Sequence, residues 1–370
     1  MIRLKTITTL DTQPTNQPVV ERNVLLQFAN ANKSFFNDLL CRHYSFNDNE
    51  INAYSEKINW TQLSYNRFIN WTDLMIETYK SKLNWMALSS NTQLPWSVEL
   101  IEKYILLWNR VSLSLNPKLP WNDALLQEYI DGWSWDQLSY NAGLPWNDAL
   151  IEKFKDNWNW EFICMNEYIP WNEEFINKYE PYLKWETLSA NEGLPWSEAF
   201  IEKHFDKLAW PGLSGNAGIQ WSKELFSKYI NNIDLWFFSG NSNFQWDEMF
   251  IKQNQSEFDW DALSRNLGLP WSEKLLAEFE NEWEWGEMGL SSNYALPWSE
   301  QLIEKYESRW EYNATHGLCS NIDLPWTLNL VNKYADRWDY EYLSINGGLW
   351  TKVFEPSIDV GIVEDFYKNW

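Results

Sequence analysis

Residues 138–154 read LSYNAGLPWNDALIEKF, and close copies of this stretch fill most of the 370-residue chain. The tryptophan after its Leu-Pro pair, Trp146, is one of nine in succession that stand 25 residues apart, and three more follow at slightly different spacings. The twelve positions are Trp71, Trp96, Trp121, Trp146, Trp171, Trp196, Trp221, Trp246, Trp271, Trp298, Trp326 and Trp350. A fixed short period is typical of solenoid proteins, in which each repeat buries its apolar face against its neighbours.

The residue after each tryptophan predicts the start of a helix, which we call helix A (147–154 in the quoted copy). It is Ser, Thr, Asn or Asp in all twelve copies. These side chains accept hydrogen bonds from the free N–H groups of a first helical turn. Five residues after Trp146 comes Ile151, and most other copies carry an apolar residue there, as in a hydrophobic staple. Leu150 and Phe154 continue the apolar face at helical spacing.

A second, short helix follows in each repeat, and we call it helix B (135–140). Trp133-Ser134-Trp135 supplies its start signal, and an asparagine ends it in every copy. Asparagine tolerates the left-handed conformation that closes many helices, and a glycine two residues later fits the same turn. These glycines are Gly143, Gly193, Gly218 and Gly268. The proline before most of the tryptophans then separates helix B from the next helix A.

The asparagines that end helix B are the clearest structural site in the sequence. They are Asn66, Asn91, Asn116, Asn141, Asn166, Asn191, Asn216, Asn241, Asn266, Asn293, Asn321 and Asn346. A polar residue repeated between apolar faces would be buried without a partner unless its side chain bonded to the backbone. We therefore expect a ladder in which each asparagine side chain bonds backbone groups of its own turn or of the neighbouring one.

Together these signals predict an all-α protein, an α-solenoid of about thirteen two-helix repeats of 25 residues that forms one elongated domain. The chain divides into a polar N-terminal segment (1–20), an N-terminal cap (21–45), the helical repeat array (46–350) and a C-terminal capping half-repeat (351–370). The half-repeat consists of a loop with Pro356 and a copy of helix A. Most of the 28 tryptophans occupy recurring positions and are expected in the core.

The composition narrows the range of partners. With 52 acidic and 29 basic residues, the net charge is −23, which argues against direct binding of nucleic acid in a groove. A basic protein partner and a solvated surface without a charged partner fit this charge equally well. Three cysteines are too few for a disulfide scaffold. No apolar run reaches membrane length and the first residues lack a signal-peptide core, so we expect no membrane contact and a cytoplasmic location.

No catalytic constellation is visible in the sequence. His43, His204 and His316 lie more than a hundred residues apart, and we find no metal-ligand cluster, Ser-His-Asp arrangement or glycine-rich phosphate loop. His204 stands where other copies carry Tyr and is expected to be a core ring. Glu174 and Lys178 have the spacing of an exposed pair within one helix. The sequence thus predicts a protein that is not an enzyme and has no cofactor or metal.

Two resemblances bear on the fold. The pattern L-S-x-N-x-x-L-P partly resembles the leucine-rich-repeat consensus, but a strand would need an apolar residue where Asp136 stands, and the spacing from Trp135 is helical. Residues 46–350 more closely resemble the tryptophan-rich LSxNPxxPW repeat arrays of bacterial and giant-virus proteins, with LSLNPKLPW at 113–121 as the closest copy. That resemblance implies helical repeats and brings no activity with it.

The longer spacings among the last copies predict where a partner binds. Two residues are added in one repeat and three in the next, both within 283–321. Insertions in solenoids form loops, and loops on a rigid scaffold often carry binding residues. The candidate partner-binding residues are Tyr312 as an amphipathic anchor, His316 as a titratable donor, and Gly286, Gly289 and Gly317 for backbone freedom.

Three functions stay open on this sequence. The favoured one is a non-enzymatic repeat scaffold that binds another protein. An acidic immunity or inhibitor protein that neutralises a basic toxin or a nucleic-acid enzyme would bind its target tightly and in a salt-sensitive way. A carbohydrate-binding array that uses exposed tryptophans would instead bind sugars with little dependence on salt.

Overall fold

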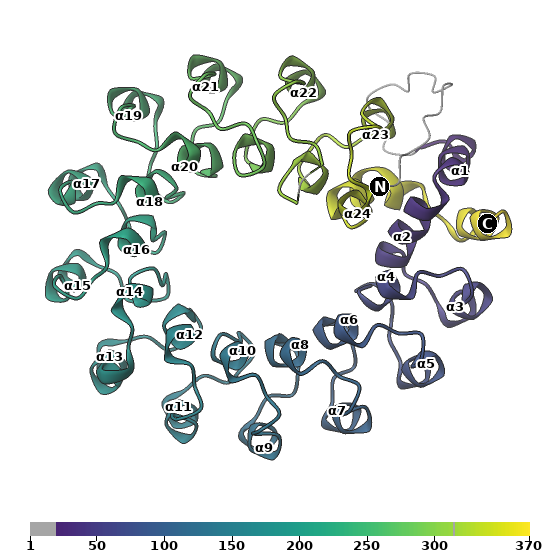
Figure 1. The fold of residues 1–370 in the computed structure, drawn as a ribbon, viewed down its shortest axis with the longest axis horizontal. Helices are drawn as coiled ribbons and strands as arrows, with labels where there is room; N and C mark the ends of the chain where they lie inside the picture. The colour runs from purple at the N-terminus through teal and green to yellow at the C-terminus, as the bar shows by residue number, and fades with distance from the viewer. Residues whose placement is uncertain (1–19, 314) are drawn as a thin grey trace. The chain divides into compact units, whose positions relative to one another are not determined.

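The computed structural model describes residues 20–313 and 315–370, and every regular element in this part of the chain is helical (Figure 1). The helices α1–α26 are short and follow one another in a regular repeated order. The predicted α-solenoid of two-helix repeats is therefore confirmed. The predicted polar segment 1–20 lies, except for residue 20, outside the described residues.

The chain forms two compact units rather than the one elongated domain expected from the sequence. Unit 1 holds the residues up to Asn84 together with Trp271–Trp370, and unit 2 holds Trp85–Pro270. The reason is that the two ends of the chain pack into the same unit, a contact that a repeat motif alone does not reveal.

In unit 2, helix A and helix B alternate along the chain. The helices B are α6 (Trp85–Ser90), α8 (Arg110–Leu115), α10 (Trp135–Ser139), α12 (Trp160–Met165), α14 (Trp185–Leu188), α16 (Trp210–Gly215), α18 (Leu235–Ser239) and α20 (Trp260–Arg265). The helices A are α7 (Val98–Lys103), α9 (Asp123–Glu128), α11 (Asp148–Lys153), α13 (Glu173–Tyr179, followed by η1, Glu180–Tyr182), α15 (Glu198–Lys203), α17 (Lys223–Tyr229) and α19 (Glu248–Gln253). Each helix B packs against the next helix B, so that the helices B form a row. The helices A lie together along one side of this row (Figure 1).

The predicted N-caps of helix A are present in eleven of the twelve copies. The cap side chain accepts a hydrogen bond from the N–H group three residues further on, at 2.9 Å for Asn147. Thr351 is the exception and lies inside the helical segment η4 (Trp350–Phe354). Here Asn346 caps α25 (Gly347–Leu349), and the helical backbone continues from it through Thr351, so the loop expected before the last helix A is wrong.

The asparagine that ends helix B is extended rather than left-handed. At Asn166 φ is −82° and ψ is 111°, and no described residue has a positive φ. The expected left-handed closure is wrong because the side chain closes the turn itself: Oδ1 of Asn141 accepts the N–H of Gly143 at 2.6 Å. Gly143 is required for space instead, since a Cβ there would lie 2.1 Å from the carbonyl oxygen of Pro117 in the preceding repeat.

The same asparagines join each repeat to the one before it. The side chain of Asn141 is buried, and its Nδ2 donates to the carbonyl oxygens of Ser114 at 2.6 Å and Asn116 at 3.3 Å. The same pair of bonds is made by Asn116, Asn216, Asn241, Asn266 and Asn346. With its oxygen bonded in its own turn and its nitrogen bonded to the neighbour, each of these buried amides is satisfied, and together they form the expected ladder.

A second bond between repeats comes from the residue two before the asparagine. Oγ of Ser139 donates to the carbonyl oxygen of Trp135 at 2.7 Å and accepts the N–H of Asn159, in the next repeat, at 2.9 Å. Cys164 takes the same place, and its Sγ accepts the N–H of Lys184 at 3.2 Å. Burial raises the pKa of the Cys164 thiol to about 11. Cys164 is therefore a serine-sized thiol in a structural position.

The tryptophans fill the space between the helices. Nε1 of Trp146 donates to the carbonyl oxygen of Asn141 at 2.8 Å, and Nε1 of Trp158 donates to that of Ile151 at 3.1 Å. The ring of Trp135 in helix B contacts the Trp158 ring of the next repeat, with 4.8 Å between the ring centroids. Indole rings whose polar atom is bonded suit a core position.

In unit 1 the two ends of the chain pack on each other. Its N-terminal elements are α1 (Arg22–Ala31), α2 (Lys33–His43), α3 (Asp48–Tyr54), α4 (Trp60–Ser64) and α5 (Asp73–Tyr79). Its C-terminal elements are α21 (Glu273–Glu278), η2 (Leu290–Ser292), α22 (Glu300–Lys305), η3 (Leu318–Ser320), α23 (Leu328–Lys333), α24 (Tyr340–Ser344), α25, η4, η5 (Glu355–Ser357) and α26 (Val360–Lys368). Helix α2 packs on α24 and α1 packs on α26. The N-terminal cap expected at 21–45 and the C-terminal half-repeat expected at 351–370 therefore pack on each other.

Aromatic rings form the core of this contact between the ends. The Phe36 ring lies 4.9 Å from the ring of Phe366 and 5.9 Å from that of Phe354, and all three side chains are fully buried. The hydroxyl of Tyr367 donates to Oδ1 of Asn37 at 2.7 Å inside this core. The row of helix-B segments in unit 1 runs from η2 and η3 through α24 and α2 to α4, across the junction of the chain ends.

The ladder makes a direct prediction for Asn191, whose Nδ2 donates to the carbonyl oxygen of Cys164 at 2.7 Å. Asn191→Ala leaves buried backbone groups without partners, so we expect a loss of about 1–3 kcal/mol in the free energy of unfolding. Urea titration followed by circular dichroism measures it, with the exposed neighbour in Glu192→Ala as the control. Equal unfolding midpoints for the two variants would refute the ladder.

The junction predicts that stability falls in mild acid. His43 is buried with its ring stacked on Trp350 at 5.5 Å, and burial, reinforced by Arg42, lowers its pKa to about 4. The unfolded chain binds a proton near pH 6.5 and the folded chain only near pH 4, so stability is lost as pH falls through this window, by up to about 3 kcal/mol. His43→Gln removes this titration. We expect the unfolding free energy of the wild-type protein to fall relative to His43→Gln between pH 6.5 and 4, and parallel curves would contradict it.

Candidate protein-binding surface

Helix B presents one side to solvent in every repeat, and helix geometry determines which side. We number the positions of helix B back from the ladder asparagine. The fifth and the first residue before the asparagine are four residues apart and therefore share one face of the helix. The third residue before the asparagine lies on the opposite face. In α10, Leu138 and Ser139 are buried, whereas Asp136 and Tyr140, the residue directly after the helix, are exposed. We call the two exposed positions, taken over all repeats, the helix-B surface.

Large apolar side chains gather on the helix-B surface. Eight are exposed there: Met86, Val111, Leu115, Tyr140, Met165 and Trp236 in unit 2, and Met288 and Ile345 in unit 1. The first five lie in the consecutive helices α6, α8, α10 and α12 or, for Tyr140, directly after one of them, and we call them the apolar row. Their exposed fractions run from 44% to 57%. Contiguous exposed apolar side chains mark interaction sites, and methionines adapt their shape to a partner.

Carboxylates border the apolar row. Asp136, Glu161 and Glu186 are exposed five residues before the ladder asparagine of their repeats, on α10, α12 and α14. In the described part of the chain none of the three forms an ion pair with lysine or arginine, and Asp136 accepts a hydrogen bond from Nδ2 of Asn159 at 2.8 Å. These negative charges are therefore available to an external cation.

Two cations lie on the same stretch of helices B. Lys184 is exposed at the start of α14. Arg110 stands in α8 where other copies have the helix-B tryptophan, and its guanidinium lies 5.8 Å from the centre of the Tyr129 ring. Arg110 is thus used inside the fold, which leaves Lys184, directly before α14, as the one exposed cation in or next to the described helices α6, α8, α10, α12 and α14.

A second apolar part of the helix-B surface lies on α18. Leu235 takes the place of the helix-B tryptophan there, and the indole shifts to Trp236, which is 46% exposed. Phe237 contacts this ring edge-on at 4.8 Å, and the guanidinium of Arg265 from α20 lies 5.4 Å from its centre. Tryptophan and arginine are enriched among the residues that dominate binding energy at interfaces.

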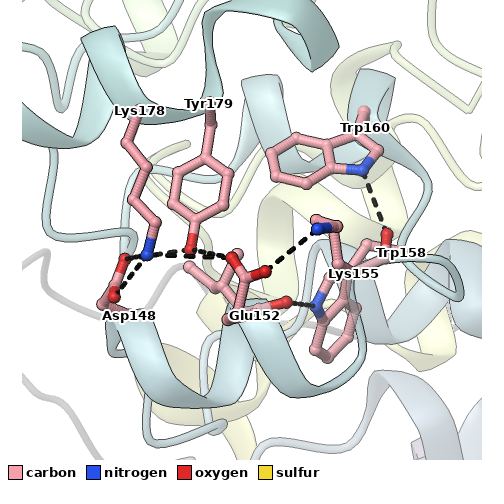
Figure 2. Close-up of polar contacts among 8 residues, drawn as sticks. Asp148, Glu152, Lys155, Trp158, Trp160, Lys178 and Tyr179 are labelled. Carbon is pink, nitrogen blue, oxygen red and sulfur yellow. Dashed lines mark hydrogen bonds and ion pairs between the residues drawn. The ribbon is translucent and has the colours of Figure 1, made fainter.

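The helix-A side carries ion pairs between repeats instead. Figure 2 shows Lys178 of α13 beside Asp148 and Glu152 of α11, with Nζ 2.7 Å from an Asp148 oxygen and 3.7 Å from a Glu152 oxygen. The Tyr179 hydroxyl donates to Asp148 at 2.9 Å, and these bonds from Lys178 and Tyr179 hold the pKa of Asp148 below its usual value. The pairing of Lys178 with Glu174 expected within one helix is wrong, because the lysine reaches the preceding repeat.

The same bridge recurs along the helices A. It joins Lys153 to Asp123, Lys203 to Glu173 and Lys228 to Glu198. Exposed pairs of this kind add little stability each, about 0–1 kcal/mol. These charges on the helix-A side are therefore paired within the protein, in contrast to the described carboxylates beside the apolar row.

Tyr312 does not reach the surface. Its side chain is only 5% exposed, and its ring packs on Tyr334 at 5.2 Å and Trp338 at 5.3 Å in the next repeat. The role of an exposed anchor is therefore wrong, because Tyr312 occupies the place of the helix-B tryptophan. The sequence indicates this position of Tyr312, since Trp310-Glu311-Tyr312 repeats the pattern of Trp133-Ser134-Trp135.

The other residues of the predicted site lie in two loops that touch. His316 is exposed, and its Nδ1 lies 3.4 Å from Oε1 of Glu287 in the preceding loop. Gly286 is half-buried, whereas Gly289 and Gly317 are buried, and the 3₁₀ turns η2 and η3 replace α-helical turns here. A Cβ on Gly289 would lie 2.0 Å from a backbone oxygen of its own loop. The structure thus brings His316 close to this loop, and partner contact at these residues stays a prediction.

The remaining candidate groups are part of the core. His204 is buried with its ring stacked on Trp185 at 4.9 Å, and burial lowers its pKa. Across residues 20–313 and 315–370, no group of three or more His, Cys, Asp or Glu side chains is placed to hold a metal ion. Within the same residues, every helix is too short or too polar to cross a lipid bilayer.

No protein-family model matches this chain, and neither a curated protein nor a solved structure matches it. The resemblance of residues 46–350 to tryptophan-rich LSxNPxxPW arrays therefore stays a prediction, and the function has to be argued from the surface itself.

The buried position of Tyr312 predicts opposite outcomes for two substitutions in the inserted region. Tyr312→Ala removes a core ring and should lower the free energy of unfolding by about 3–5 kcal/mol. His316→Ala, at an exposed site, should change it by less than about 0.5 kcal/mol. Tyr312→Trp restores the ring of the other copies and should keep most of the stability. Urea unfolding compares the three variants, and a stable Tyr312→Ala protein would show that the ring is not part of the core.

Proposed function

We propose that this protein is a non-enzymatic scaffold that binds another protein through its helix-B surface. The apolar row supports the proposal: Met86, Val111, Leu115, Tyr140 and Met165 are exposed at equivalent positions of helices that pack on one another in succession. Burying such side chains against a partner removes apolar surface from water, which is the main favourable contribution in most protein associations.

The fold itself does not require apolar side chains at these positions. The position occupied by Leu115, Tyr140 and Met165 is taken by Ala190, Gly215 and Gly240 in later repeats of unit 2. Helix B forms in those repeats as well, and its buried leucine or phenylalanine is unchanged in role. Helix B thus forms with glycine or alanine at this position, so exposed apolar residues there are best explained by contact with another protein.

The immunity or inhibitor function is a special case of this proposal. The carboxylates beside the apolar row favour a basic target, as that function requires. No observation favours the carbohydrate array, because the helix-B tryptophans are at least partly buried. The Trp160 ring, for example, lies 5.3 Å from the Tyr179 ring and stacks on Tyr182 at 4.9 Å. Among the described residues only Trp236 and Trp370 are exposed.

A cytoplasmic location is part of the same proposal. The three cysteines, Cys41, Cys164 and Cys319, are all buried free thiols. Burial raises the pKa of each thiol, to about 12, 11 and 11 in that order. Unpaired structural thiols are typical of proteins in reducing compartments.

Charge placed on the apolar row should abolish partner binding. We compare the wild-type protein, Leu115→Glu/Tyr140→Glu, and the matched control Ala124→Glu/Ala149→Glu, which adds the same charge at exposed positions of helix A. Each is used to capture proteins from extracts of the source cells for mass spectrometry. We expect the wild type and the control to capture the same protein and the row variant to lose it at least about tenfold.

All three proteins must first show equal circular dichroism spectra and melting temperatures. Equal capture by the row variant and the control would exclude the apolar row as the binding site, and the loops near His316 would then be tested next.

A further inference from the structure

We infer that the partner segment is basic and amphipathic, with apolar side chains seated on the apolar row and lysines or arginines facing Asp136, Glu161 and Glu186. This inference rests on the proposed function and adds the chemistry of the partner to it. The three carboxylates are exposed, and in the described part of the chain they form no ion pair, whereas the lysines of the helix-A side are engaged with carboxylates of neighbouring repeats.

The two kinds of group overlap along one row of helices. Apolar side chains lie on α6, α8, α10 and α12, and carboxylates lie on α10, α12 and α14. On α10 the two meet within one turn, since Asp136 and Tyr140 are four residues apart, and Glu161 and Met165 on α12 have the same relation. A segment that lies along the row therefore meets an apolar group and a carboxylate on the same helix, twice in succession.

The length of the row sets the size of the partner segment. Packed helices lie about 8–10 Å apart, so five successive helices B span roughly 32–40 Å. A helix rises about 1.5 Å per residue, and an 18-residue amphipathic helix of about 27 Å covers three of the four steps. Apolar side chains on one face and cations on its flanks match the groups that this row presents.

Other partner charges fit less well. An acidic segment would place carboxylates against Asp136, Glu161 and Glu186, and like charges brought together at an interface cost several kcal/mol. Phosphate groups of a nucleic acid would meet the same repulsion, with Lys184 as the one exposed cation in or next to these described helices B.

Two synthetic 18-residue peptides test the inference. Both carry leucines on one helical face, and the other positions are lysine in one peptide and glutamate in the second. Each is labelled with a fluorophore and titrated with the full-length protein by fluorescence anisotropy at low ionic strength. The proteins are the wild type, Glu161→Lys/Glu186→Lys, and Glu102→Lys/Glu174→Lys. The last pair reverses two exposed carboxylates of helix A, so that both variants have the same net charge.

The lysine peptide should bind the wild-type protein, and the glutamate peptide should bind at least about tenfold more weakly. Glu161→Lys/Glu186→Lys should weaken the lysine peptide about tenfold or more, while the helix-A control changes its Kd by less than about threefold. Leu115→Glu/Tyr140→Glu should weaken both peptides, because it removes the apolar contact that they share.

Equal weakening by the row variant and the helix-A control would overturn the inference, since the attraction would then come from the net charge alone. Equal binding of the two peptides would overturn it as well. If the peptides fail in this way while Leu115→Glu/Tyr140→Glu still loses a captured protein, the partner binds at the row but is not basic, and the proposed function stands.

Discussion

The structure depends on a buried asparagine side chain whose amide group finds its hydrogen-bond partners in two successive repeats. Helix B has only about one turn, so most of its backbone N–H and C=O groups lack partners within the helix. Asn141 supplies them from the side: its oxygen bonds the backbone that follows helix B, and its nitrogen bonds the carbonyl groups that end helix B of the repeat before. The hydroxyl of Ser139 accepts the N–H of Asn159, which directly precedes helix B of the following repeat. A single repeat therefore cannot satisfy its own backbone, and neighbours are obligatory.

This requirement explains the contact between the chain ends. A terminal repeat has one neighbour too few, and unit 1 supplies the missing one from the other end of the chain. The ladder extends into the N-terminal segment, where Nδ2 of Asn66 donates to the carbonyl oxygens of Cys41 and Tyr44 in place of a preceding repeat. Helix α2, which contains Cys41, packs on α24 from the opposite direction. Helix α2 thus lies between two helices B, α4 and α24, although its own sequence lacks the repeat motif.

The repeats, their caps and their asparagine bonds could be predicted because each follows from local geometry that recurs in every copy. The conformation of the asparagine could not, since a left-handed residue and a side-chain bond such as that of Asn141 to Gly143 close a turn equally well. The pattern of Phe36 and Phe366 predicts buried faces but not that each face covers the other. The burial of Tyr312 follows from its place after Trp310, which matches that of Trp135 after Trp133, whereas the insertion around it favoured an exposed loop.

The candidate surface consists of helix-B positions whose residues differ from one repeat to the next. Some positions are nearly the same in all copies: the asparagine, the serine or cysteine two residues before it, and the buried leucine. Their side chains bond or pack within their own repeat or against the neighbouring one. Where the copies differ, as between Tyr140 and Gly215, helix B forms with either residue, so the fold does not require a particular side chain at these positions. Side chains there can change from apolar to acidic without loss of the fold. A repeat of this kind separates the residues that hold the array together from those that can vary, and the apolar row with its carboxylates belongs to the second set.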